Sequence, residues 1–429
     1  MKALRRWALV GLAATSPAIF TSPAVAGGGS NAITDWQIVM ESAIPGVAAR
    51  KNVVALPYWG YVTVAMFDAV NSIDRGYKPF AVNMKAPVGA SQDAAAASAA
   101  HDVLVHYFPA QTADLDTALA NSLAKIADGQ SKTDGVNVGK AVAAQWLAMR
   151  TGDGLEAPLT YTPGHGPGIW EPVPTVPASP PTTPPPVGVW MTEFKPLAMK
   201  SADQFLREIP PPPALGSQLW ARNFNRTKNF GAQNSTVRTP AETDIGLFWT
   251  DEAASQYSRA LRGLMSNQNL NTADSARLAA MFYVAASDAG TACMNAKYHF
   301  AFWRPYTAIH DADTDGNPDT VADPNWVPLA PTPGHPEYPA NHGCVTQAAM
   351  DAIEQFFGTD EVPFSVDSKV TNTTHVFGSV DDVVKEVDNA RVYGGMHYHH
   401  STREGNRLGN MVTSYIFKHY FQRHGDGND

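Results

Sequence analysis

The chain has 429 residues, of which 44% are hydrophobic and 10% aromatic, and its formal net charge is -9. That much apolar sequence excludes an intrinsically disordered protein and is sufficient for a large folded core. The acidic balance argues against nucleic acid as a partner, because binding to a phosphate backbone requires a basic surface.

The first 26 residues are predicted to be an export signal. Basic residues precede an almost wholly apolar run, and Ala24-Val25-Ala26 then gives the small-x-small pattern of a cleavage site. An uncleaved anchor is the alternative, although the run is short for crossing a bilayer and no later segment is apolar for long enough to form a membrane span. We therefore expect a periplasmic or secreted protein whose mature part, residues 27–429, is a single helical domain; a homo-oligomer is left open.

Apolar residues recur at spacings of three and four along most of the chain, which predicts helices. The irregular segment 152–188 is rich in proline and glycine but keeps Trp170, so we expect an ordered loop that covers a face. No alternation typical of a long strand is present, and the fold class is predicted to be all-α. The expected helices span residues 35–42, 58–72, 91–107, 111–127, 133–150, 241–250, 252–266, 272–300, 342–357, 380–398 and 402–422.

A polar loop, 311–326, begins with acidic residues at alternate positions. Asp311, Asp313 and Asp315 resemble the start of a calcium loop, but Ala322 occupies the twelfth position, where glutamate is needed. A plain turn rich in Asp and Asn is the alternative.

The first cationic segment contains Lys297 and Arg304, seven residues apart among aromatic residues. On one helix face their side chains would converge only if an anion drew both inward, and the aromatic surroundings would strengthen the field of the two cations. A solvated helix face is the alternative.

The second segment brings His342 to the start of a helix, directly after Pro336 and Pro339. The free N–H groups of a first helical turn favour an anion there. A histidine at this place can exchange a proton with a bound oxygen, although a histidine that caps or packs is the alternative.

The third segment contains Arg391 and His397, separated by Gly394-Gly395. A straight helix would point these two side chains about 120° apart, so a shared site needs a bend, which the glycines allow. His399 and His400 follow and raise zinc as an alternative, but no acidic or cysteine partner stands at a familiar spacing.

Taken in order, these segments resemble the three-part signature K-x6-R-P, P-S-G-H and S-R-x5-H of the vanadium haloperoxidase and type 2 phosphatidic acid phosphatase superfamily. The neighbourhoods KYHFAFWRP and HPEYPANHG look closest to bacterial exported haloperoxidases, and the resemblance is tightest from residue 275 to 410. The chain departs from the signature at four positions: Ala340 and Asn341 replace Ser and Gly, Ala390 replaces Ser, and Ser401 replaces a frequent Asp.

The resemblance implies two packed four-helix bundles of the vanadium haloperoxidase and acid phosphatase type, with an oxyanion bound between helices. His397 would then bond vanadium or attack phosphorus, and His342 would act as general acid–base. The oxyanion would be held by Lys297, Arg304 and Arg391 together with the backbone at Asn341 and Gly343. Lys297 would also polarise bound peroxide.

The implied activity is vanadate-dependent oxidation of a halide by hydrogen peroxide to hypohalous acid. His335 and Trp303 are candidates for a halide site, and His335 favours bromide or iodide. An acid phosphatase that forms a phosphohistidine from a phosphate ester is an alternative in the same pocket, and a non-catalytic phosphate-binding protein is another. Cys293 and Cys344 lie beside the first two motifs and are either bridged or two buried thiols.

Overall fold

The computed structural model describes residues 31–44, 52–177 and 182–425. The predicted export signal, residues 1–26, lies outside the described residues. The α-helices are α1 Ala32–Ala43, α2 Leu56–Asp74, α3 Gln92–Tyr107, α4 Thr112–Ala124, α5 Gln130–Met149, α6 Gln218–Gly231, α7 Pro240–Phe248, α8 Ala253–Asn267, α9 Thr272–Phe300, α10 Pro305–His310, α11 Asn341–Phe357, α12 Val380–Tyr393 and α13 His399–His419.

One small hairpin adds the β-structure that the sequence analysis did not predict. Strand β1, Phe364–Ser368, pairs antiparallel with β2, Thr373–Phe377, in the register Phe364 to Phe377. The helices α6 and α10 were also missed. The remaining predicted helices are present, with ends within a few residues of those expected, apart from the C-terminal end of the predicted helix 380–398.

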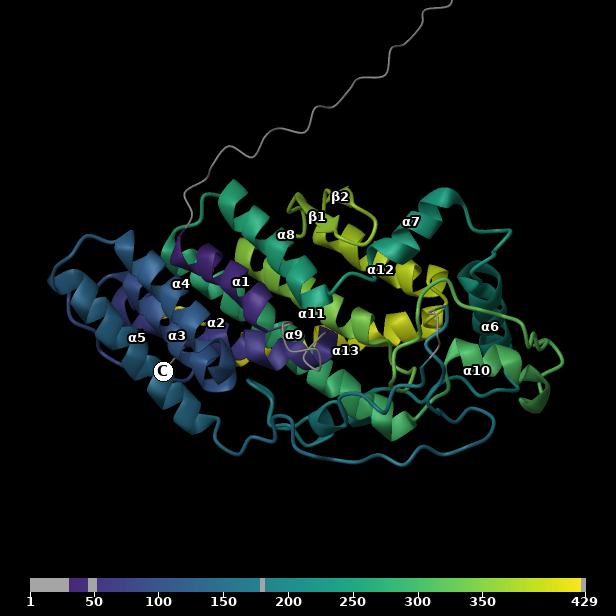
Figure 1. Ribbon diagram of the computed structural model, residues 1–429. Coiled ribbons are helices and arrows are strands. Elements are labelled where there is room, and N and C mark those ends of the chain that lie inside the picture. Colours follow the sequence, from purple (N-terminus) through teal and green to yellow (C-terminus); the bar gives the residue numbers. More distant parts are fainter. Residues whose placement is uncertain (1–30, 45–51, 178–181, 426–429) are drawn as a thin grey trace, which may run out of the picture.

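The helices form two groups that share α9 (Figure 1). On one side α2 packs against α3, α5 and α9, and on the other side α11 packs against α9, α12 and α13. The C-terminal end returns to the first group, where the backbone N–H of Lys78 donates to the carbonyl of Gln422. The mostly helical fold that was predicted is confirmed.

Helix α2 is the most apolar part of the described chain. Contrary to the expectation that no segment after the export signal is apolar for long enough, Val53–Asp74 is long and apolar enough to cross a membrane, but its most apolar window is completely buried in the protein. Since the neighbours that cover it are α3, α5 and α9, this segment is a core helix rather than a membrane span.

The irregular segment after α5 is ordered over its described residues and is anchored to α9. The backbone N–H of Trp170 donates to the carbonyl of Ala301 at 2.7 Å. Asp288, buried on α9, accepts three backbone N–H bonds at 2.7 to 2.8 Å from the stretch Leu197–Met199. A buried carboxylate with three such partners fixes the loop against the helix.

Glycines set the distance between α11 and α13. A Cβ atom at Gly343 would lie 2.5 Å from the carbonyl oxygen of Thr402, and one at Gly405 would lie 2.5 Å from that of Ala340. The two helices can approach this closely only without those side chains. Their contact fixes the first turn of α11, where the second motif lies.

Candidate active site

Lys297 and Arg304 do not share one helix, contrary to the expectation from their spacing. Helix α9 ends at Phe300, Ala301 adopts a left-handed conformation with φ 45°, and Arg304 is the N-cap of α10. The Lys297 ammonium is fully buried and donates to the carbonyls of Pro336 and Glu337 at 2.9 and 2.8 Å. The interval between Lys297 and Arg304 therefore contains the end of α9. The bend there directs both cations toward the second motif.

The Arg304 guanidinium joins the second and third motifs. Its Nε donates to the His335 carbonyl at 2.8 Å, and one terminal nitrogen donates to the Met396 carbonyl at 2.9 Å. The same nitrogen lies 3.1 Å from His397 Nε2, and the other lies 3.0 Å from His335 Nδ1. Arg304 is fully buried, so these contacts hold it at a fixed place.

His342 lies in the first turn of α11, as predicted. The N-cap Ala340 offers no side-chain hydrogen bond, so the N–H groups at the start of this helix stay available for an anion. His342 is half-buried and has no hydrogen-bond partner among the residues that the structure describes. Burial, and then the nearby Arg391, hold the pKa of His342 well below its ordinary value.

Arg391 and His397 are brought together by a helix break. Helix α12 ends at Tyr393, Gly395 has φ 73°, and α13 begins at His399, so the predicted continuous helix over 380–398 is wrong. The Arg391 carbonyl accepts the backbone N–H groups of Met396 and His397 at 3.1 and 3.2 Å. A Cβ atom at Gly395 would lie 2.6 Å from the Gly231 carbonyl oxygen, so the turn requires glycine for space as well as for conformation.

Sequence reasoning missed Glu337, which holds the ring of His397. Its carboxylate is fully buried and lies 2.8 Å from His397 Nδ1. It also accepts the Tyr398 N–H at 3.1 Å and the Ser401 hydroxyl at 2.7 Å. Because the carboxylate bonds Nδ1, the ring carries its proton there and keeps the lone pair on Nε2. An acid between two prolines beside a motif histidine was the signal that could have found it.

Three buried cations meet here with little compensating charge. Burial lowers the pKa of Lys297 to about 8, that of Arg304 to about 10 and that of Arg391 to about 9. Arg391 bonds only the Trp249 carbonyl at 2.9 Å and Met396 Sδ at 3.0 Å, and its Nε has no partner in the described part of the chain.

The nearest acid, Glu337, has a pKa raised to about 7 by burial. The pKa values of His335 and His397 are held well below normal, first by burial and then by the surrounding cations, so both rings are neutral. Even with Glu337 ionised, the cluster keeps an excess of two positive charges, which suits a doubly charged oxyanion.

A cavity of about 230 Å³ opens against this cluster. Four parts of the chain supply the polar lining named next: the loop before α8, the loop before α11, the N-terminal part of α11, and the end of α12 with the turn that follows. Its polar lining consists of Thr250, Asp251, His335, Asn341, His342, Thr346, Arg391 and His397. The five cationic and imidazole side chains singled out in the sequence therefore surround one place, with Lys297 and Arg304 behind the cavity wall.

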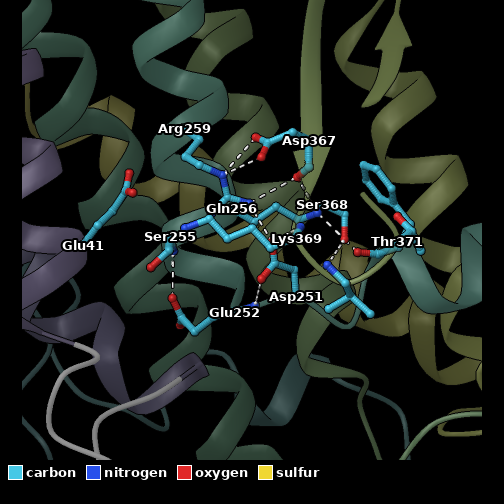
Figure 2. A network of polar contacts seen from close by, with 12 residues as sticks. Glu41, Asp251, Glu252, Ser255, Gln256, Arg259, Asp367, Ser368, Lys369 and Thr371 are labelled. Atoms are coloured by element: carbon cyan, nitrogen blue, oxygen red, sulfur yellow. Dashed lines mark hydrogen bonds and ion pairs between the residues drawn. The ribbon is translucent and has the colours of Figure 1, made fainter. Parts of the chain in front are cut away.

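A network of polar contacts links the cavity-lining residue Asp251 to α8 and the hairpin (Figure 2). Arg259 on α8 donates to Asp251 at 2.6 Å and to Asp367 of β1 at 2.8 Å. The backbone N–H of Lys369 donates to the same Asp251 carboxylate at 3.0 Å. Since Asp251 lines the cavity, these bonds hold this part of its wall against two secondary-structure elements.

Two sequence predictions do not fit these positions. Trp303, a predicted halide-site candidate, is not among the residues that line the cavity, and its ring stacks on Trp220 at 5.8 Å. The calcium loop is not formed: the Asp315 carboxylate accepts bonds from Trp220 Nε1 and the Thr320 hydroxyl. No cluster of three metal-binding side chains occurs among the described residues, including Asp311 and Asp313.

The cysteines are two free thiols rather than a bridge in this structure. Cys293 and Cys344 are both fully buried, and Cys293 Sγ contacts the Pro339 carbonyl at 3.6 Å. Burial and then a hydrogen bond with Cys293 raise the pKa of Cys344 well above its usual value. The thiols therefore lie side by side between α9 and α11 as protonated, buried groups.

Comparisons with known proteins found matches to vanadium haloperoxidases. A family model described as the VCPO second helical-bundle domain matches residues 277–426. The vanadium chloroperoxidase of Curvularia inaequalis is 32% identical over 155 residues, which cover 30% of this chain and 25% of that protein. The C-terminal part of the chain is therefore similar in sequence to the vanadium chloroperoxidase family. The sequence match thus spans a quarter of the length of this curated relative.

Solved structures of the superfamily share the whole fold. The crystal structure of the first bacterial vanadium-dependent iodoperoxidase superimposes with a TM-score of 0.75 at 21% identity, covering 91% of this chain and 96% of that one. A holo-type bacterial vanadium-dependent chloroperoxidase superimposes with a TM-score of 0.71 at 16% identity, covering 91% and 98%. The superfamily fold therefore extends well beyond the matched C-terminal region.

Proposed function

We propose that the protein is a vanadate-dependent haloperoxidase that converts a halide, hydrogen peroxide and a proton to hypohalous acid and water. The observation that carries the proposal is the uncompensated charge of Lys297, Arg304 and Arg391 around a cavity that also exposes two neutral histidines. The similarity of residues 277–426 to the second helical-bundle domain of vanadium chloroperoxidases supports it. A periplasmic or secreted location is part of the proposal.

The donor set fits vanadate. His397 would hold it through Nε2, because Nδ1 is committed to Glu337. In the oxyanion-free protein Arg304 lies 3.1 Å from that Nε2, so it must turn toward the oxyanion when the histidine binds. Arg391 has an unused Nε, and the first turn of α11 adds backbone N–H groups at Asn341 and Gly343. When bound, vanadate supplies a Lewis acid that activates peroxide.

His342 is the residue placed to move protons. Its pKa is depressed by burial and by three cations, which a bound oxyanion would neutralise. The pKa of the ring therefore rises on anion binding toward the range in which it can accept a proton from peroxide and return it to a departing oxygen. Lys297, fixed by two carbonyls, contributes a buried positive charge on the oxyanion side.

Bromide or iodide is the proposed halide. His335 lines the cavity and is held by Arg304, so it presents a neutral ring beside the cationic cluster. A neutral ring with apolar neighbours favours a large, weakly hydrated anion, which is cheaper to desolvate than a small one.

An acid phosphatase remains the second candidate, because a neutral His397 with a free Nε2 lone pair is also a suitable nucleophile for phosphorus. A phosphate-binding protein without turnover is the third. Purified protein should be assayed with and without orthovanadate for triiodide formation from iodide and peroxide, for hydrolysis of p-nitrophenyl phosphate, and for binding of inorganic phosphate.

Iodide oxidation that depends on vanadate supports the proposal, whereas ester hydrolysis inhibited by vanadate would replace it with a phosphatase. Phosphate binding without either reaction would leave a binding protein. His397→Asn should abolish iodide oxidation, while His399→Asn, two residues along and half-buried, is the matched control. Full activity of His397→Asn would refute the assignment of this histidine.

A further inference from the structure

A histidine of the hairpin lies between two acids, outside the cavity. His375 on β2 has Nδ1 2.6 Å from Oε1 of Glu386 on α12 and Nε2 2.9 Å from Oδ2 of Asp244 on α7. A neutral imidazole has one N–H, so only the doubly protonated, charged ring satisfies both acids when they are ionised. We call these three residues the imidazole clamp. It joins the hairpin, α7 and α12, which lie together in Figure 1.

The charged groups around the ring favour its protonated form. The hydrogen bond to Glu386 raises the pKa of His375 above its ordinary value, and the acid on α7 adds to this effect against that of burial. On β1 the residue opposite His375 is the uncharged Val366, and the next acid of that strand, Asp367, is paired with Arg259. The His375 side chain is 17% exposed, so the ring can exchange its protons with solvent.

The imidazole clamp acts on the end of α7, which reaches the candidate active site. Helix α7 ends at Phe248, whose ring stacks on that of His375 at 3.8 Å, and Trp249 follows as the C-cap. The Nε1–H of Trp249 donates at 2.9 Å to the same Glu386 oxygen that faces the imidazole. The Trp249 carbonyl accepts a bond from Arg391 at 2.9 Å. The atoms that bind the imidazole therefore also fix the carbonyl that holds Arg391.

Arg391 depends on this carbonyl for its direction. Its other partner is Sδ of Met396, a weak acceptor, and its Nε has no partner among the described residues. Both Trp249 and Arg391 line the cavity. A shift of the Trp249 carbonyl would therefore remove the stronger of the two contacts that hold this cation before an oxyanion arrives. A donor that is already oriented binds an anion more tightly, because binding then requires less ordering of the side chain.

We propose that His375 is a positioning residue of the oxyanion site, because its imidazolium holds α7 against α12 and thereby fixes Trp249 and Arg391. Loss of one ring proton releases one of the two acids, loosens the end of α7 and weakens oxyanion binding. A histidine with a raised pKa in the folded protein contributes fully below its ordinary pKa of about 6.5, and the contribution is lost as pH rises through the raised value. The inference rests on the proposed function only in requiring that the cavity bind an oxyanion.

The test measures orthovanadate affinity by isothermal titration calorimetry from pH 5.5 to 8.5. His375→Gln is neutral at every pH and should bind about 3- to 10-fold more weakly than the wild type at pH 5.5. The ratio of the two dissociation constants should fall toward one as the wild-type ring loses its proton. Because both proteins meet the same orthovanadate species at each pH, this ratio isolates the effect of the imidazole. His375→Arg keeps its charge and several donors, so it should restore wild-type affinity at pH 5.5 and exceed it where the wild-type ring is neutral.

His101 on α3 provides a matched control in the other group of helices. Its ring nitrogens lie 2.7 Å from Asp102 and 2.8 Å from Asp116, and the hydrogen bond to Asp102 raises its pKa as well. His101→Gln should change the pH dependence of unfolding in urea and leave orthovanadate affinity unchanged. Asp244→Ala opens the imidazole clamp at a half-buried position, so it should fold and reproduce the weaker orthovanadate binding of His375→Gln.

Equal orthovanadate affinity of the wild type, His375→Gln and Asp244→Ala at every pH would overturn the inference, even if the variants unfold at lower urea concentrations. A weaker affinity whose ratio to the wild type stays constant with pH would also overturn it, because the charge of the ring would then play no part. A wild type that binds no orthovanadate at any pH would refute the proposed function and this inference with it. The two failures are distinguishable, because only the second concerns the wild type alone.

Discussion

Replacing Arg391 with methionine is expected to stabilise the oxyanion-free protein and to weaken its binding of oxyanions. The guanidinium is 2% exposed, its Nε has no partner in the described chain, and its remaining contacts are one carbonyl and one thioether. Methionine has a similar length and adapts to irregular gaps, so the change removes mainly the charge.

The size of the effect follows from the pKa of Arg391, which burial lowers from 12.5 to about 9. At 1.36 kcal/mol per unit of pKa, the buried charge costs about 5 kcal/mol in the absence of an anion. Removing the arginine also leaves the Trp249 carbonyl without its donor, which costs about 1 to 3 kcal/mol. The net expectation is a gain of roughly 2 to 4 kcal/mol in unfolding free energy.

Thermal unfolding with and without orthovanadate measures both effects. The melting temperature of the oxyanion-free variant should rise by a few degrees, and the further increase caused by orthovanadate should shrink, because one charge-assisted contact is lost and affinity falls about 10- to 100-fold. Arg403→Met removes a positive charge from an exposed position of α13 and is the control. A less stable variant with an unchanged orthovanadate effect would refute the argument that these cations await an anion.

Three other perturbations test the site and its support. The pKa of Lys297, lowered to about 8 by burial, predicts that orthovanadate affinity falls as pH rises through 8 and the ammonium loses its proton. Lys297→Arg should remain charged and lack this break in a titration from pH 6 to 8.5, which stops below the pKa of about 9 of Arg391. Glu337→Gln should lower vanadium retention in equilibrium dialysis about 10- to 100-fold, and equal retention would contradict its role toward His397. Gly343→Ala should destabilise the protein by about 1 to 3 kcal/mol in urea, whereas Gly263→Ala, in open space on α8, should not.

The helices could be predicted because their apolar residues follow the helical repeat and their buried faces are long. Helix α6 escaped because its sequence, QLWARNFNRTKNFG, is mostly polar and charged. The hairpin escaped because its two strands have only five residues each and are held by contacts with α8 rather than by a continuous apolar face. Such elements depend on tertiary contacts that a local pattern does not contain.

The site was predictable in its residues but not in its geometry. Motif spacing identified Lys297 and Arg304 correctly while misplacing them on one helix, because spacing along the chain does not show where a helix ends. The bend expected near Gly394-Gly395 is present, but it is a full break between two helices. Glu337 was not expected, since its partner His397 is 60 residues away in the chain.

The bond between Glu337 and Ser401 changes how the loss of the usual aspartate at position 401 is understood. Ser401 donates its hydroxyl to a buried acid 64 residues earlier, and the same carboxylate bonds Nδ1 of His397. Glu337, Ser401 and His397 therefore form one bonded unit, so a change at position 401 acts on the histidine through the carboxylate of Glu337.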